Sequence, residues 1–88
     1  MEQAHKYKFS CGFETIEEGE ATFLYLRRRN DELAAIYGKP VTMHVYNELV
    51  PRWERLGTSY PDGKHVNSFG DICILEPDGR NYKHLGKA

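Results

Sequence analysis

Hydrophobic and polar side chains alternate strictly near the start of the chain. Between residues 5 and 13 every second residue is apolar, and most of these apolar residues are aromatic: Tyr7, Phe9, Cys11 and Phe13. A period of two with aromatic side chains on one side is typical of a strand that buries one face. The pattern therefore predicts a β-strand over residues 5–13.

The next segment changes to a helical pattern. Thr15 and Glu18 have the spacing of a capping box, in which each residue satisfies a free backbone N–H at the start of a helix. Apolar residues then recur near one face as far as Tyr37, and Gly38 supplies a stop signal. We predict a helix that begins near Thr15 and ends at Tyr37. We leave open the alternative that residues 21–29 form a second strand paired with the first.

A second helical pattern covers residues 42–56. Apolar side chains follow the period of a helix at Val45, Tyr46, Leu49, Val50, Trp53 and Leu56. Pro51 would kink this helix, because proline removes a backbone hydrogen bond in a helix interior. On this prediction Trp53 packs in the core. The alternative is a short strand over residues 41–46, followed by a helix that begins near Pro51, where proline fits the first turn.

The C-terminal third contains two turn sequences. Residues 57–70 show no period and include Tyr60-Pro61-Asp62-Gly63, whose proline and glycine suit a β-turn. We therefore predict a long loop over residues 57–70 that is either functional or mobile. The runs 71–75 and 80–85 flank the turn sequence Glu76-Pro77-Asp78-Gly79. Two extended runs around a Pro-Asp-Gly turn predict a β-hairpin.

These elements predict one α+β domain over residues 1–88, in the order strand-helix-helix-strand-strand. A three-stranded, mainly antiparallel sheet would pack on two helices, and residues 1–4 and 86–88 would be frayed. A chain of 88 residues is long enough for one domain but buries only a small core. A homodimer is therefore left open.

Composition narrows the classes of function. No apolar run approaches the length of a membrane span and residues 1–6 lack the apolar stretch of a secretory signal, so we expect a cytoplasmic protein without a membrane partner. The net charge of −1 argues against general binding of polyanions. The two cysteines are too few for a disulfide framework, and we expect both to be reduced and buried, with a single disulfide as the alternative. Four histidines without metal-ligand spacing predict no metal, and the lack of a phosphate-binding glycine motif predicts no cofactor.

A small hydrolase centred on His65 is the weakest functional hypothesis. Ser59, Ser68 and Asp71 lie in or beside the same predicted loop, and a histidine near a serine can act as its general base. Neither serine is surrounded by the glycines of a nucleophile elbow. We therefore favour a protein that is not an enzyme.

The last strand offers a candidate site for single-stranded nucleic acid. Its alternation places Arg80, Tyr82 and His84 on one face, where a ring could stack on a base beside cationic groups. Further basic residues extend this set to Arg27, Arg28 and Lys83. The alternative is that these charges only keep an edge strand from aggregating.

A protein-interaction domain is the hypothesis that we favour. Tyrosine, tryptophan and arginine are enriched at interface hot spots, and the chain contains six tyrosines and one tryptophan. The predicted loop supplies the partner-binding candidates Tyr60, Asp62, Lys64 and His65. The partner would be a larger protein, for which this domain serves as an adaptor, a regulator or an inhibitor.

Overall fold

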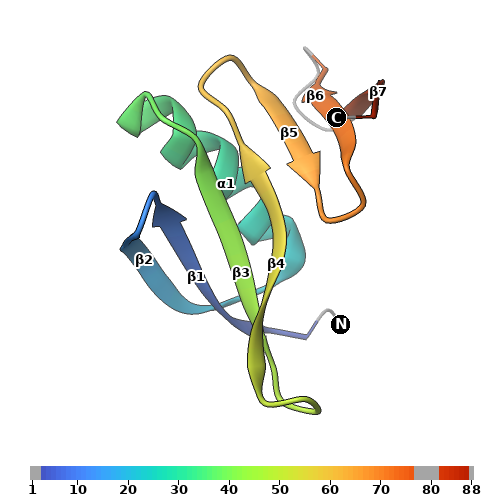
Figure 1. Cartoon of the computed structure of the whole chain (residues 1–88). Coiled ribbons are helices and arrows are strands. Elements are labelled where there is room, and N and C mark those ends of the chain that lie inside the picture. The colour runs from blue at the N-terminus through green and yellow to red at the C-terminus, as the bar shows by residue number, and fades with distance from the viewer. Residues whose placement is uncertain (1–2, 77–81, 88) are drawn as a thin grey trace.

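The computed structural model describes residues 3–76 and 82–87 (Figure 1). In this part of the chain one helix and seven strands are present. In chain order they are β1 (His5–Cys11), β2 (Glu14–Ala21), α1 (Phe23–Tyr37), β3 (Val41–Asn47), β4 (Arg52–Ser59), β5 (Lys64–Asn67), β6 (Asp71–Leu75) and β7 (Tyr82–Lys87).

The strands form a single antiparallel sheet in the order β2-β1-β3-β4-β5-β6-β7. Neighbours in the chain are neighbours in the sheet, except that β1 lies between β2 and β3. Helix α1 connects β2 to β3 and packs across one face of β1, β3 and β4 (Figure 1). The predicted fold of two helices on a three-stranded sheet is therefore wrong, because the protein is mostly β.

Strand β1 confirms the first predicted strand as far as Cys11, whereas Phe13, expected on its buried side, lies beyond the strand and is exposed. Tyr7 and Phe9 are buried, Lys6 before them is exposed, and Lys8 between them is half-buried, as the alternation requires. The strand ends at Cys11 because Gly12 adopts a left-handed φ of 65° in the turn to β2.

The first predicted helix begins too early in the chain. Residues 14–21 form β2, which pairs with β1 along its length. The Thr-x-x-Glu spacing at residue 15 is therefore not a capping box. The helix starts at Phe23, where the Oγ1 atom of Thr22 accepts the N–H of Tyr25 at 3.5 Å. The alternative of a strand over residues 21–29 is also wrong, whereas the predicted stop at Gly38 is confirmed by its φ of 64°.

The second predicted helix is wrong, because residues 41–59 form the β3–β4 hairpin. Val41, Met43 and Val45 are buried, so the period in β3 is two. The alternative of a strand over residues 41–46 is confirmed, but the helix that should follow it is replaced by β4. Pro51 lies in the hairpin turn, where the side-chain oxygen of Asn47 accepts the N–H groups of two turn residues.

The predicted loop over residues 57–70 is mostly strand. Its start belongs to β4, its middle to β5, and only the turns 60–63 and 68–70 are irregular. The final hairpin of β6 and β7 is confirmed by its antiparallel pairing. Residues 77–81 of its predicted turn lie outside the described residues. Gly86 and Lys87, expected to be frayed, pair with β6.

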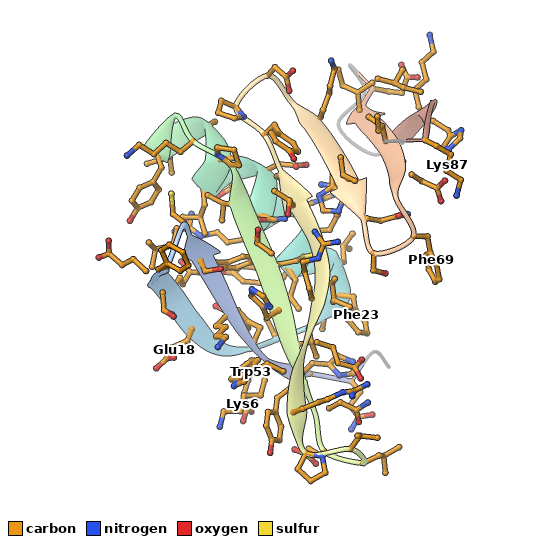
Figure 2. The ribbon with its side chains drawn as sticks, in the orientation of Figure 1. Lys6, Glu18, Phe23, Trp53, Phe69 and Lys87 are labelled. Carbon is orange, nitrogen blue, oxygen red and sulfur yellow. The ribbon has the colours of Figure 1, made fainter. Side chains whose placement is uncertain are left out.

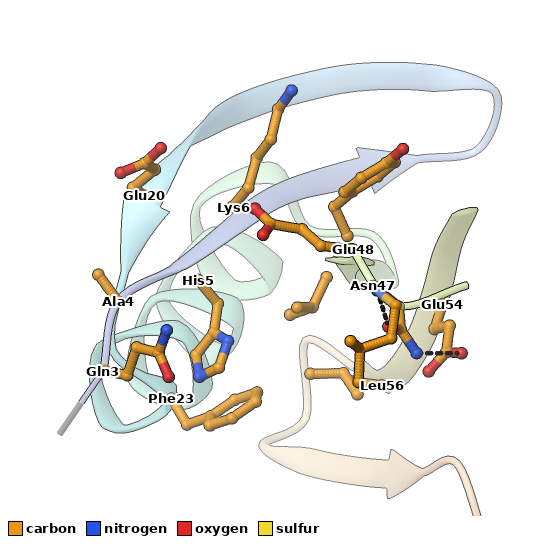
Figure 3. A pocket seen from close by; sticks show the side chains of 13 residues that line it. Gln3, Ala4, His5, Lys6, Glu20, Phe23, Asn47, Glu48, Glu54 and Leu56 are labelled. Atoms are coloured by element: carbon orange, nitrogen blue, oxygen red, sulfur yellow. Dashed lines mark hydrogen bonds between the residues drawn. The ribbon is translucent and has the colours of Figure 1, made fainter. Parts of the chain in front are cut away.

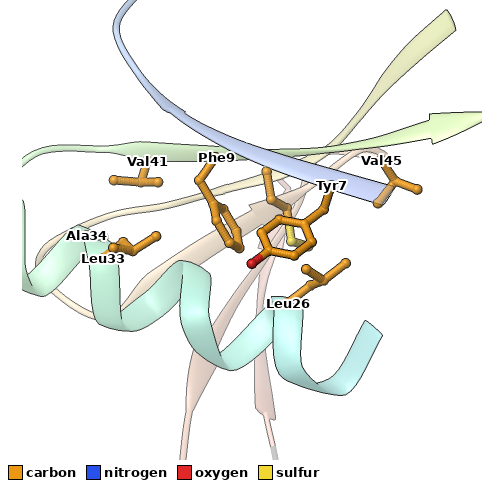
Figure 4. Packing of buried hydrophobic residues seen from close by; sticks show 8 residues of the cluster. Tyr7, Phe9, Leu26, Leu33, Ala34, Val41 and Val45 are labelled. Carbon is orange, nitrogen blue, oxygen red and sulfur yellow. The ribbon is translucent and has the colours of Figure 1, made fainter. Parts of the chain in front are cut away.

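The core lies between α1 and the sheet (Figure 4). Its fully or nearly fully buried apolar side chains are Tyr7, Phe9, Leu26, Leu33, Ala34, Val41, Met43 and Val45. Each large side chain buried in this way contributes about 1.5 to 3 kcal/mol. The strand residues of this core lie on one face of β1 and β3, and the half-buried Leu56 of β4 packs against them. The side chains on the opposite face of these strands point away from the helix.

Candidate functional site

A buried polar cluster lies beneath α1. The hydroxyl of Ser59 donates to Asp31 Oδ1 at 2.6 Å, and its oxygen lies 2.9 Å from Nδ1 of His65. Arg27 Nη1 in turn lies 2.7 Å from Asp31 Oδ2. Ser59 and His65 are only 0% and 3% exposed. The cluster therefore joins α1, β4 and β5 through hydrogen bonds, and those to Asp31 are charge-assisted.

The protonation of this cluster follows from its geometry. Burial, together with the charge of the nearby Arg27, lowers the pKa of His65 to about 4, so the imidazole is neutral at neutral pH. The single hydroxyl hydrogen of Ser59 is used in the hydrogen bond to Asp31. His65 Nδ1–H therefore donates to the serine oxygen. A serine that donates to a carboxylate and is closed to solvent does not have the arrangement of an activated nucleophile. This geometry favours a structural role for the cluster.

The fold separates one of the four predicted partner-binding residues from the other three. Tyr60 and Asp62 lie in the turn between β4 and β5, and Lys64 begins β5 with its Nζ atom 3.6 Å from Asp62. Tyr60, at 39% exposure, is accessible, but His65 turns inward and is buried. The structure therefore brings three of these four residues together on the surface.

The predicted nucleic-acid-binding residues lie on different elements. Arg27 and Arg28 belong to α1, while Lys83 and His84 belong to β7. Lys83 is opposite Ile74 and His84 is opposite Cys73 in neighbouring positions of the β6–β7 ladder, so their side chains leave opposite faces of the sheet. The imidazole of His84 lies 3.3 Å from Asp71. Arg80 is outside the described residues, and the backbone of Tyr82 opens β7.

The face of the sheet away from α1 carries an unexpected group of residues, which we call the open face. It is formed by alternate residues of the first four strands in the sheet order. Its members are Glu18 and Glu20 of β2, Lys6, Lys8 and Ser10 of β1, Thr42, His44 and Tyr46 of β3, and Trp53, Arg55 and Thr58 of β4.

Two aromatic rings lie at the centre of the open face. Tyr46 and Trp53 are opposite each other in the β3–β4 ladder, with their centroids 5.4 Å apart in an edge-to-face arrangement. The ammonium group of Lys6 lies 5.5 Å from the Tyr46 ring, and that of Lys8 lies 4.5 Å from the Trp53 ring. Figure 2 shows Lys6, Glu18 and Trp53 together on one side of the ribbon. Both lysines are within the distance of a cation–π interaction.

The charges of the open face have no ionic partners among the described residues. Within the described ranges 3–76 and 82–87, none of Lys6, Lys8, Arg55, Glu18 and Glu20 has an oppositely charged group within 4.0 Å. Burial, together with the charges of Lys8 and Arg55, lowers the pKa of His44. The Nε2 atom of this neutral imidazole lies 3.2 Å from the hydroxyl oxygen of Ser10. The open face is therefore basic in its centre and acidic along the β2 edge.

A groove of about 630 Å³ opens where the starts of β1 and α1 meet the end of β3 (Figure 3). His5 and Phe23 line it with their ring centroids 4.2 Å apart, and Leu56 contributes to its apolar floor. Its rim combines carboxylates with Lys6 and with Asn47, whose amide donates to Glu54 at 3.1 Å. This mixed lining specifies no single ligand chemistry.

Other kinds of site can be assessed only where the chain is described. No group of three or more metal-ligating side chains is present among residues 3–76 and 82–87. Cys11 and Cys73 are free thiols and half-buried, so the expected full burial is not observed. Helix α1 is not long and apolar enough to cross a membrane. Comparison with protein-family models, curated proteins and solved structures finds no match to this chain.

Sequence reasoning missed the open face because it placed Tyr46 and Trp53 inside a helix. The signal that could have revealed it is the alternation of residues 41–46, in which Tyr46 falls on the side opposite to the buried valines. The position of Trp53 then follows from its pairing with Tyr46.

Proposed function

We propose that this protein is a non-enzymatic protein-interaction domain, of the adaptor, regulator or inhibitor kind, and that it binds its partner through the open face. The observation that carries this proposal is the Tyr46–Trp53 pair, which lies partly exposed on a sheet face that no described element covers. A solvated face of an antiparallel sheet ordinarily carries polar side chains. Tyrosine and tryptophan at such a position are typical hot-spot residues of an interface.

The charges around the rings favour a protein over a single-stranded nucleic acid. Lys6 and Lys8 already lie over the two rings, which reduces the ring area available to a stacked base. Glu18 and Glu20 border the same face and would repel a phosphate backbone. A protein partner can match both signs of charge, and the net charge of −1 for the whole chain agrees with such a partner.

The test compares two aromatic residues of the same chain. Trp53→Ala removes a ring from the open face, and Tyr60→Ala removes an exposed ring from the β4–β5 turn as a matched control. We expect Trp53→Ala to weaken capture of the protein partner from nuclease-treated lysate by about tenfold or more, because a hot-spot ring is worth about 1.4 kcal/mol or more. Circular dichroism verifies that both variants are folded.

Two outcomes would overturn this proposal. If Tyr60→Ala abolishes capture while Trp53→Ala leaves it intact, the β4–β5 turn is the binding site. If the wild type is retained on single-stranded RNA or DNA, and Trp53→Ala or Lys8→Gln releases it, a nucleic-acid ligand replaces the protein partner. In the second case binding would also weaken steeply with salt, because phosphate contacts release counterions.

A further inference from the structure

The open face is organised in rows that cross the four strands. The register of the ladders aligns one residue from each strand, in the order β2, β1, β3, β4. The first row is Glu20, Lys6, Tyr46 and Trp53; the second is Glu18, Lys8, His44 and Arg55; the third is Thr15, Ser10, Thr42 and Thr58.

The second row has opposite charges at its two ends. Glu18 lies on the edge strand β2, and Arg55 lies on β4, with two strands between them. A two-fold axis parallel to the strands and midway between β1 and β3 exchanges β2 with β4 and β1 with β3. Such an axis lays a second copy face to face on the first and superimposes each row on itself in reverse order.

We infer that the partner of the open face is a second copy of this chain, held face to face by reciprocal contacts between Glu18 of one copy and Arg55 of the other. This inference rests on the proposed function, because it names the partner of that same surface. The two-fold axis forms each contact twice, as in any isologous dimer. Two antiparallel sheets that stack face to face pack with their strands nearly aligned.

The other rows fit the same arrangement. In the first row Lys6 of one copy faces Tyr46 of the other, so the cation–π contact seen within one chain is repeated between chains. In the third row Ser10 faces Thr42, and these short hydroxyl side chains allow the two sheets to approach closely. In the second row Lys8 faces His44, which is neutral at neutral pH and therefore does not repel it.

A second copy also accounts for the presence of both charge signs. An acidic partner would be repelled by Glu18 and Glu20, and a basic partner by Lys6, Lys8 and Arg55. A second copy carries both the acidic β2 edge and the basic centre, and the two-fold axis places Glu18 of each copy opposite Arg55 of the other. Burial of this face would add to the small core of an 88-residue chain.

The test is a charge exchange measured by sedimentation equilibrium from low micromolar to submillimolar protein. Wild type is expected to dimerise. Glu18→Arg alone and Arg55→Glu alone each place like charges opposite each other twice per dimer, so each should raise the dimer dissociation constant by about tenfold or more. An equimolar mixture of the two variants restores both attractive contacts and should recover dimerisation, as should the double variant. Glu14→Arg is the matched control, since Glu14 is exposed on β2 but pairs with Cys11 outside the rows.

The outcomes separate this inference from the proposed function. A wild type that stays monomeric at every concentration overturns the inference, and so does a dimer that both single reversals leave unchanged. If the chain does not dimerise in this way but Trp53→Ala still abolishes capture of a different protein, the proposed function stands and only the dimer inference falls. If both single reversals leave the dimer unchanged and Trp53→Ala leaves the capture of every protein unchanged, both proposals fall.

Discussion

Acidification should destabilise this protein through His65. The pKa of this buried imidazole is about 4 in the folded protein, against an ordinary value of 6.5. Above pH 6.5 the group is neutral in both states and contributes nothing to the pH dependence. Between pH 6.5 and about pH 4, His65 is protonated in the unfolded chain but stays neutral in the folded protein. The free energy of unfolding therefore falls as the pH falls.

The size of this effect follows from the difference between the two pKa values. One pKa unit corresponds to about 1.4 kcal/mol, so the loss reaches about 3 kcal/mol once the pH has fallen to about 4. A domain of this length has a total stability of about 4 to 13 kcal/mol. The protonation of a single histidine therefore removes a substantial part of the stability.

Urea unfolding at a series of pH values, followed by tryptophan fluorescence, measures this loss. His65→Gln lacks the titrating group, so its stability should depend less on pH over this interval than that of the wild type. His44→Gln separates the contribution of His44, because the pKa of that histidine is also lowered and acts in the same direction. Equal pH dependence in wild type and His65→Gln, or a His65 pKa near 6.5 by NMR, would refute the reasoning.

Thermal and urea unfolding test three further predictions. Gly57→Ala should lower the free energy of unfolding by about 1 to 3 kcal/mol, because a Cβ atom there would lie 2.7 Å from a carbon of the His65 ring. Gly19→Ala is the control and should be tolerated, since its Cβ atom would meet the Tyr7 ring at 3.4 Å; an equal loss of stability in both variants would contradict this. Ser59→Ala should cost about 1 to 3 kcal/mol by leaving buried groups unpaired, so an unchanged midpoint would argue against the hydrogen bonds of the cluster. Asn30 is fully buried and its side-chain amide has no hydrogen-bond partner among the described residues, so Asn30→Leu should stabilise the protein, whereas destabilisation would show that the amide is satisfied.

The parts of the fold that could be predicted are those specified by local sequence. Strand β1 was predictable because its alternation is strict, and the end of α1 because Gly38 adopts the left-handed conformation that glycine favours. The turn over residues 60–63 was predictable from its proline and glycine, and it is closed by a hydrogen bond from Gly63 N to the carbonyl of Tyr60 at 3.0 Å.

The parts that failed depend on pairing between distant segments. Strand β2 is rich in glutamate and contains a glycine, so its strand propensity is low, and its pairing with β1 overrides that propensity. Residues 42–56 fit a helical period by coincidence, because Tyr46 and Trp53 lie on the outer face of two strands while Val45 lies on the inner face. Short apolar segments of this kind are resolved only by their neighbours in the sheet.

The buried cluster was partly visible in the sequence. Ser59 and His65 were noted as close in the chain, and the hairpin does bring them to 2.9 Å. Asp31, 28 positions before Ser59, could not be assigned to them because its contact requires α1 to cross β4. The closeness of Ser59 and His65 in the chain suggested a hydrolase. The hydrogen bond from Ser59 to Asp31 instead favours a structural network.

The accessibility of Trp53 tests the central claim most directly. It is the single tryptophan of the chain and lies on the open face, so its fluorescence reports on that surface alone. Acrylamide quenching should be compared between the free protein and its complex with a protein partner, whether a second copy or another chain. We predict that quenching falls and that the emission shifts to shorter wavelength when the complex forms. A complex that forms fully while the quenching and emission of Trp53 stay unchanged would contradict the account, because the partner would then bind elsewhere.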